Sequence, residues 1–123
     1  MGPPPHAALQ RLIDIRAADT SFALDELSRL ARIAPSSPLA GHLDLDHVGI
    51  AGHSLGGATA AQVMAGDRRF KVGVDLDGKL FGKEPAARLD RPFLWIQSAD
   101  AKTAEYVSGE IGFSPASVTV ARW

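Results

Sequence analysis

The stretch GIAGHSLGGATA, residues 49–60, decides the fold class, because a single serine stands where one residue pattern gives way to another. The run before it, HVGIAG (47–52), is short, apolar and β-branched, which is typical of a buried strand. The run after it, GGATAAQVMAGD (56–67), is rich in alanine and predicts a helix. Ser54 is therefore expected in a strand-to-helix turn, where the helix N-terminus offers free N–H groups.

Further short apolar runs repeat the strand pattern. They are KVGVDLD (71–77), PFLWIQS (92–98) and SVTVARW (117–123). Apolar residues at helical spacing predict a long helix over residues 6–33, interrupted at Asp19-Thr20-Ser21, and a weaker helix over 101–109. Strands that alternate with helices indicate an α/β fold, with a parallel sheet of about four strands flanked by helices.

Length and composition limit the other possibilities. A chain of 123 residues has the usual size of one domain, so residues 1–123 are expected to form a single domain. Its net charge is -1 and its basic residues are scattered, which argues against nucleic acid as a partner. The absence of cysteine excludes disulfides, thiolate catalysis and Cys-based metal sites. We expect neither a signal peptide nor a transmembrane segment.

The five residues Gly52-His53-Ser54-Leu55-Gly56 match the pattern G-x-S-x-G. In this motif the serine takes a strained backbone conformation that exposes its hydroxyl, and the two glycines remove side chains that would collide with the strand and helix. The Leu55 N–H would then face an oxyanion that develops on a substrate carbonyl. The alternative is a structural turn in which Ser54 only caps the helix.

A nucleophilic serine needs a base and a carboxylate that orients the base. Asp77 closes the run 71–77 at the same end of the sheet as Ser54, and Asp100 follows the run 92–98; spacing alone does not separate these two candidates. The fold that carries this motif places its histidine after the acid, but no histidine follows His53.

The four histidines each have a position that bears on this gap. The His53 side chain is expected to point away from that of Ser54, and His42 and His47 precede the strand, at its far end from the serine. His6 precedes the first helix, whose start is expected on the same rim as the serine turn.

The segments HVGIAGHSLGGATAAQVMAGDRRFKVGVDLDGKLFG (47–82) and RPFLWIQSAD (91–100) resemble the platelet-activating factor acetylhydrolase family and related bacterial lipase-like members of the α/β-hydrolase superfamily. The resemblance implies that Ser54 is the nucleophile and favours Asp77 as the acid. It also implies hydrolysis of a small-molecule or lipid ester with a short or oxidised acyl chain, without a metal or organic cofactor.

The resemblance places the chain in the carboxyl-terminal half of that fold, cut before the histidine. Two functions therefore compete: a serine ester hydrolase whose histidine lies outside this segment, and a catalytically incomplete chain that folds or associates without hydrolase activity. In the half-fold the strand 47–52 would have one bare edge around Val48 and Ile50, so we expect either self-association into a homo-oligomer through this edge or marginal stability.

Overall fold

The computed structural model describes residues 5–79, 89–98 and 118–122. These residues form two helices and four strands in the order α1 (Pro5–Ile33), β1 (Val48–His53), α2 (Leu55–Gly66), β2 (Phe70–Leu76), β3 (Phe93–Gln97) and β4 (Val118–Arg122). The four strands expected from the sequence are confirmed, as are the helices that begin near residues 6 and 56. The helix predicted over 101–109 lies outside the described residues.

Helix α1 is continuous, so the predicted interruption at Asp19-Thr20-Ser21 is wrong. The hydroxyl groups of Thr20 and Ser21 donate hydrogen bonds in a way that leaves the backbone hydrogen bonds of α1 intact. Thr20 Oγ1 donates to the Arg16 carbonyl oxygen at 2.7 Å, and Ser21 Oγ donates to Asp67 Oδ2 at 2.9 Å. A Ser or Thr that bonds back to the preceding turn, or to another element, does not compete for the helix's own N–H groups.

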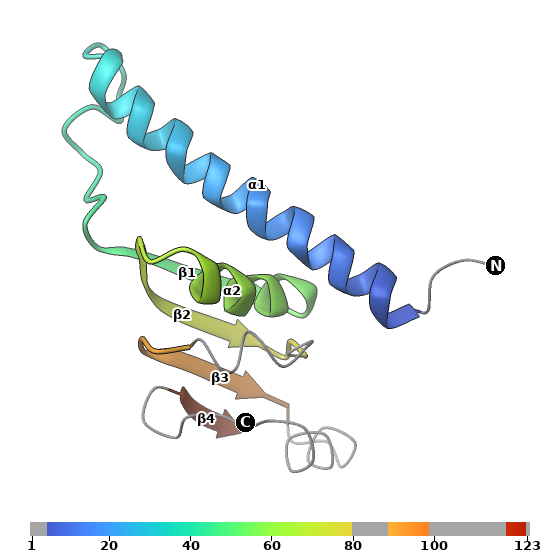
Figure 1. Ribbon diagram of the computed structural model, residues 1–123. Coiled ribbons are helices and arrows are strands. Elements are labelled where there is room, and N and C mark those ends of the chain that lie inside the picture. Colours follow the sequence, from blue (N-terminus) through green and yellow to red (C-terminus); the bar gives the residue numbers. More distant parts are fainter. Residues whose placement is uncertain (1–4, 80–88, 99–117, 123) are drawn as a thin grey trace.

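The four strands form one parallel sheet in the order β1-β2-β3-β4 (Figure 1). A parallel connection needs a crossover, and α2 supplies it between β1 and β2. Helix α1 packs on α2, which in turn packs on β1 and β2. Trp95 and Phe93 of β3 join Met64 of α2 in the core. On the other face of the sheet, Val72 and Leu76 remain partly exposed.

Strand β1 pairs only with β2 among the described residues, so it is an edge strand, as expected. The side chains of Val48 and Ile50, however, pack against the core cluster and are partly buried. They point toward the helices because alternate residues of a strand face opposite sides of the sheet. What this edge leaves unpaired is therefore the backbone of β1, while the apolar side chains of Val48 and Ile50 pack against the core.

The end of α2 that is remote from Ser54 is fixed by two arginines. Arg91 donates to the carbonyl oxygens of Met64, Phe70 and Asp67, the last at 3.0 Å. Arg69 donates to Asp67 Oδ2 at 2.7 Å. The last carbonyls of a helix have no partner within the helix, so these contacts satisfy groups that would otherwise be left open.

Candidate active site

Ser54 lies between β1 and α2 in a conformation that L-residues rarely adopt, with φ 55 and ψ -117. Its side chain is exposed and makes no capping hydrogen bond to α2. The expected strained turn is thus present, and the alternative in which the hydroxyl only caps the helix is not supported. Asp77 is the other non-glycine residue with a positive φ among the described residues, at 56. Such strain is found mainly at functional sites.

Two glycines allow the chain to turn this sharply. A Cβ on Gly52 would lie 2.1 Å from the carbonyl oxygen of Gly56, so this position accepts only glycine. The expectation that Gly56 also avoids a collision is wrong, because a Cβ there would meet nothing within 4 Å. Gly57 takes that role instead, since its Cβ would lie 1.8 Å from Asp75 Oδ1.

Neighbouring strands fix Ser54 and Asp77 through their backbones. The Ser54 N–H donates to the carbonyl oxygen of Leu76 at 2.8 Å, and the Asp77 N–H donates to that of Ile96, also at 2.8 Å. Asp77 Oδ1 accepts the N–H of Ser98 at 2.5 Å. These bonds extend the ladder of the parallel sheet past the ends of its strands. The positions of both residues therefore depend on the sheet.

Ser54 and Asp77 line one cavity of about 230 Å³, together with Leu9, Leu55 and Lys79. Leu55 is the first residue of α2. The first amide that bonds within the turn is Gly57 N–H, which donates to the Ser54 carbonyl oxygen at 3.0 Å. The amides of Leu55 and Gly56 precede this bond and, like the first amides of any helix, have no partner within the helix. Their N–H groups can therefore donate hydrogen bonds to an oxyanion.

The four histidines belong to different parts of the described chain, and none of them lines this cavity. His53 is exposed at the end of β1. His47 Nδ1 contacts Asp44 Oδ2 at 2.8 Å, before β1 begins, and His42 is exposed in the same connection. His6 lies in the first turn of α1, which begins on the side to which the strand arrowheads point (Figure 1).

A comparison with protein families gives a match over most of the chain. The family described as "Platelet-activating factor acetylhydrolase, isoform II" matches residues 6–111. The chain belongs to this family.

Individual relatives agree with the family match. The chain is 41% identical over 58 residues to platelet-activating factor acetylhydrolase of Bos taurus and 40% identical over 62 residues to that of Cavia porcellus. These matches cover 46% and 49% of this chain, but only 13% and 14% of the relatives. Among solved structures, a ferulic acid esterase from Streptomyces cinnamoneus matches with a TM-score of 0.64 and 30% identity, over 91% of this chain and 31% of that one. The partial α/β-hydrolase fold is thereby confirmed.

One buried group of this acetylhydrolase-family chain was not singled out by its sequence pattern. Asp75 is fully buried, Oδ1 accepts the Gly78 N–H at 2.6 Å, and Oδ2 has no hydrogen-bond partner among the described residues. Burial raises the pKa of the Asp75 carboxyl to about 7, and the charge of Asp77 acts in the same direction. The available signal was the position of Asp75 inside the apolar run 71–77, between Val74 and Leu76.

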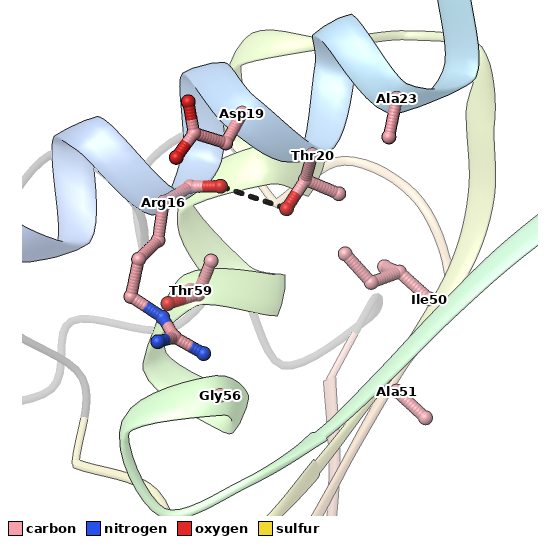
Figure 2. Close-up of a pocket in the computed structure, with 8 residues that line it drawn as sticks. All are labelled: Arg16, Asp19, Thr20, Ala23, Ile50, Ala51, Gly56 and Thr59. Carbon is pink, nitrogen blue, oxygen red and sulfur yellow. Dashed lines mark hydrogen bonds between the residues drawn. The ribbon is translucent and has the colours of Figure 1, made fainter. Parts of the chain in front are cut away.

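A second hollow of about 450 Å³ lies on the other side of the serine turn, between α1, β1 and the start of α2. Figure 2 shows the Arg16 side chain extending from α1 toward Thr59 and Gly56. Gly56 therefore faces open space, which explains why a side chain there would meet no obstacle.

Two further observations concern what the site could hold. In the described part of the chain, no group of three or more His, Asp or Glu residues is placed to bind a metal ion. No helix in the same residues is both long enough and apolar enough to cross a membrane. Asp100, the second candidate acid, lies outside the described residues.

Proposed function

We propose that this chain carries the nucleophile and the acid of a serine carboxylic ester hydrolase. Ser54 is the nucleophile, Asp77 is the acid and the Leu55 amide belongs to the oxyanion hole. The observation that carries the proposal is that Ser54 and Asp77, the two described non-glycine residues with positive φ, line the same cavity. Family membership and the likeness to an esterase support the same reaction class.

The reaction would proceed by acyl transfer through the serine. Ser54 Oγ attacks the ester carbonyl carbon and gives its proton to a histidine base, while the carbonyl oxygen becomes an oxyanion beside the Leu55 N–H. Collapse of this intermediate breaks the bond to the alcohol, which takes the proton from the histidine. Water then attacks the acyl-serine by the same route and releases the carboxylic acid product. Asp77 orients the histidine and stabilises its charged form.

The size of the cavity bears on the substrate. Its volume of about 230 Å³ lies below the roughly 300 Å³ at which sites for drug-sized ligands begin. The cavity suits a short acyl chain better than a long one. We therefore propose a small-molecule or lipid ester with a short acyl group as the substrate class.

His6 is the first candidate for the histidine base. Leu9 lines the cavity with Ser54 and Asp77. His6 lies three residues before Leu9 in α1, and residues at this spacing share one face of a helix. A histidine outside this segment is the other source.

The proposal is tested by labelling with a fluorophosphonate, which reacts covalently with an activated serine. We expect the probe on Ser54, no labelling of Ser54→Ala and unchanged labelling of Ser28→Ala, whose hydroxyl bonds to Leu24 within α1. The Asp77→Asn variant should label much more slowly. If His6 is the base, His6→Ala loses labelling as well.

The opposite results favour the competing function. A folded chain that the probe does not label, or ester turnover that is equal in wild type and Ser54→Ala, contradicts the proposal. It would show a catalytically incomplete chain in which the turn is only structural.

A further inference from the structure

The Asp75 carboxyl occupies a slot that two glycines create. A Cβ on Gly57 would lie 1.8 Å from Oδ1, and one on Gly78 would lie 2.3 Å from Oδ1 and 2.6 Å from Oδ2. The Cβ on Gly78 would also lie 2.6 Å from the carbonyl oxygen of Ser54. The carboxyl is therefore enclosed between the start of α2, the serine turn and the turn that follows β2.

This carboxyl fixes the residue that follows Asp77. Asp75 Oδ1 accepts the Gly78 N–H, and the Gly78 carbonyl oxygen accepts the indole N–H of Trp95 at 3.0 Å. Both polar groups of Gly78 are thus bound to buried side chains, because Trp95, like Asp75, is fully buried. Asp77 lies between two anchored neighbours, since Leu76 O binds the Ser54 N–H.

We propose that Asp75 is a positioning residue, which in its neutral form holds the Asp77–Gly78 turn in place beneath Ser54 and on ionisation releases it. This proposal deepens the proposed function and rests on it for the role of Asp77. Asp75 itself does not line the cavity and touches no substrate. It acts through the Gly78 amide on the orientation of Asp77.

The surroundings of Asp75 favour the neutral carboxyl. The elements packed against it contribute Gly52, Gly57, Gly78 and the uncharged indole of Trp95, so the described residues offer Oδ2 no donor. Asp77 is the ionisable neighbour, and its negative charge opposes a second one. The Gly78 hydrogen bond acts in the opposite direction, since an N–H donor favours the ionised carboxyl, but burial is the larger effect. A buried charge with a single N–H partner is still costly, and movement of the turn into water relieves that cost.

The sign of the pH effect follows from the raised pKa of Asp75, about 7 against the usual 3.8. Between these values the unfolded chain has lost the proton and the folded chain retains it. The folding equilibrium constant should therefore fall with rising pH, by up to about tenfold per unit from roughly pH 4 to 7. Above pH 7 the folded state also ionises, so the decline stops.

Carbon-13 and nitrogen-15 NMR of the folded protein tests the proposal without any need for activity. We expect one Asp carboxyl carbon to titrate near pH 7. The amide signals of Asp77 and Gly78 and the indole signal of Trp95 should shift with the same midpoint. The carboxyl titration and the three amide and indole shifts should be absent from Asp75→Asn. They should be present in the control Asp90→Asn, because the Asp90 carboxylate is exposed and bound to Arg68.

Fluorophosphonate labelling of Ser54 then tests the effect on the site. The base titrates in both proteins, so its contribution cancels in the ratio of the Asp75→Asn rate to the wild-type rate. We expect this ratio to rise by up to about tenfold between pH 6 and 8, as the wild-type carboxyl ionises.

Each outcome has a defined meaning. If no Asp carboxyl titrates above pH 6, or if Asp77 and Trp95 do not follow Asp75, the proposal is wrong, and these wild-type signals decide even if Asp75→Asn does not fold. A labelling ratio that is constant with pH also overturns the positioning role. A folded wild type that is never labelled refutes the proposed function, while the NMR titration still reports whether Asp75 controls the turn.

Discussion

The two ends of α2 differ in how their polar groups are satisfied. At its start, Ser54 and Asp77 have strained backbones, and the buried Asp75 has one oxygen without a described partner. At its end, Asp67 accepts hydrogen bonds from Ser21 and Arg69, and the terminal carbonyls bind Arg91. Both ends belong to the same helix.

This difference indicates that the far end of α2 contributes mainly to stability, whereas its start forms the candidate site. Strain and unpaired polar groups cost free energy, and they persist only where the surrounding structure compensates for them. The network at the far end of α2 anchors the helix, so its start can hold an unfavourable turn. We therefore expect substitutions at the far end to alter stability mainly, and those at the serine end to alter both stability and the site.

Gly52→Ala should have the largest effect. The new Cβ would lie 2.1 Å from the Gly56 carbonyl oxygen and 2.7 Å from the Gly57 nitrogen, which are backbone atoms that cannot rotate away. We expect a loss of about 3 kcal/mol or more in the free energy of unfolding, measured with urea.

The matched control is Gly56→Ala, where a Cβ would meet nothing within 4 Å. Alanine is also the better helix former, by roughly 0.5–1 kcal/mol, so this variant should be as stable as wild type or more stable. Equal losses for both variants would show that the turn does not depend on the close approach at Gly52.

Arg91→Met tests the far end of α2. It keeps much of the apolar stem but removes the donors to Met64, Phe70 and Asp67. Because the Arg91 side chain is 12% exposed, we expect a loss of about 2–3 kcal/mol in urea denaturation. Arg68→Met, at a side chain that is 76% exposed, should cost less than about 0.5 kcal/mol. Similar losses for the two variants would contradict the anchoring role.

The acid dependence of stability tests the same end through Asp67. Hydrogen bonds from the Arg69 side chain lower the pKa of Asp67 to about 2, so the folded state holds the ionised form more strongly than the unfolded chain does. This contribution is complete above about pH 4 and is lost as the pH falls toward 2. We expect a loss of about 1 kcal/mol after allowance for solvent screening. It should be absent from Asp67→Asn, and acid unfolding curves that are parallel for the variant and wild type would refute it.

The smallest effect concerns the bare edge of β1. We expect the chain to self-associate there, and Ala51→Lys, at an exposed position of the strand, should raise the dissociation constant about threefold in sedimentation velocity. Leu12→Lys, at an exposed position of α1, should leave it unchanged. A compact monomer at all concentrations would exclude this association.

The sequence predicted the framework well because strand and helix periodicity are local properties. The run 47–52 became β1 at 48–53, and the run 71–77 became β2 at 70–76. The strained turn at Ser54 was also predictable, because only a few residues carry the motif. Whether Asp77 or Asp100 is the acid stays a prediction, as does the role of each candidate catalytic residue.

Other features depend on which elements meet in space, and the sequence did not reveal them. The Ser21 hydroxyl, which was expected to interrupt α1, instead donates to Asp67, which lies 46 residues away. The need for glycine at position 57, and not at 56, depends on Asp75 from the neighbouring strand. The burial of Asp75 itself depends on Trp95 and α2, which close its slot.

The backbone bonds from Ser54 to Leu76 and from Asp77 to Ile96 have a consequence for how specificity can change. The spacing of the proposed reacting pair is inherited from strand pairing. We expect substitutions of Leu9, which lines the cavity from α1, to alter which ester enters and to leave the spacing of the pair unchanged. Substitutions inside β2 and β3, by contrast, would disturb the reaction without altering what enters.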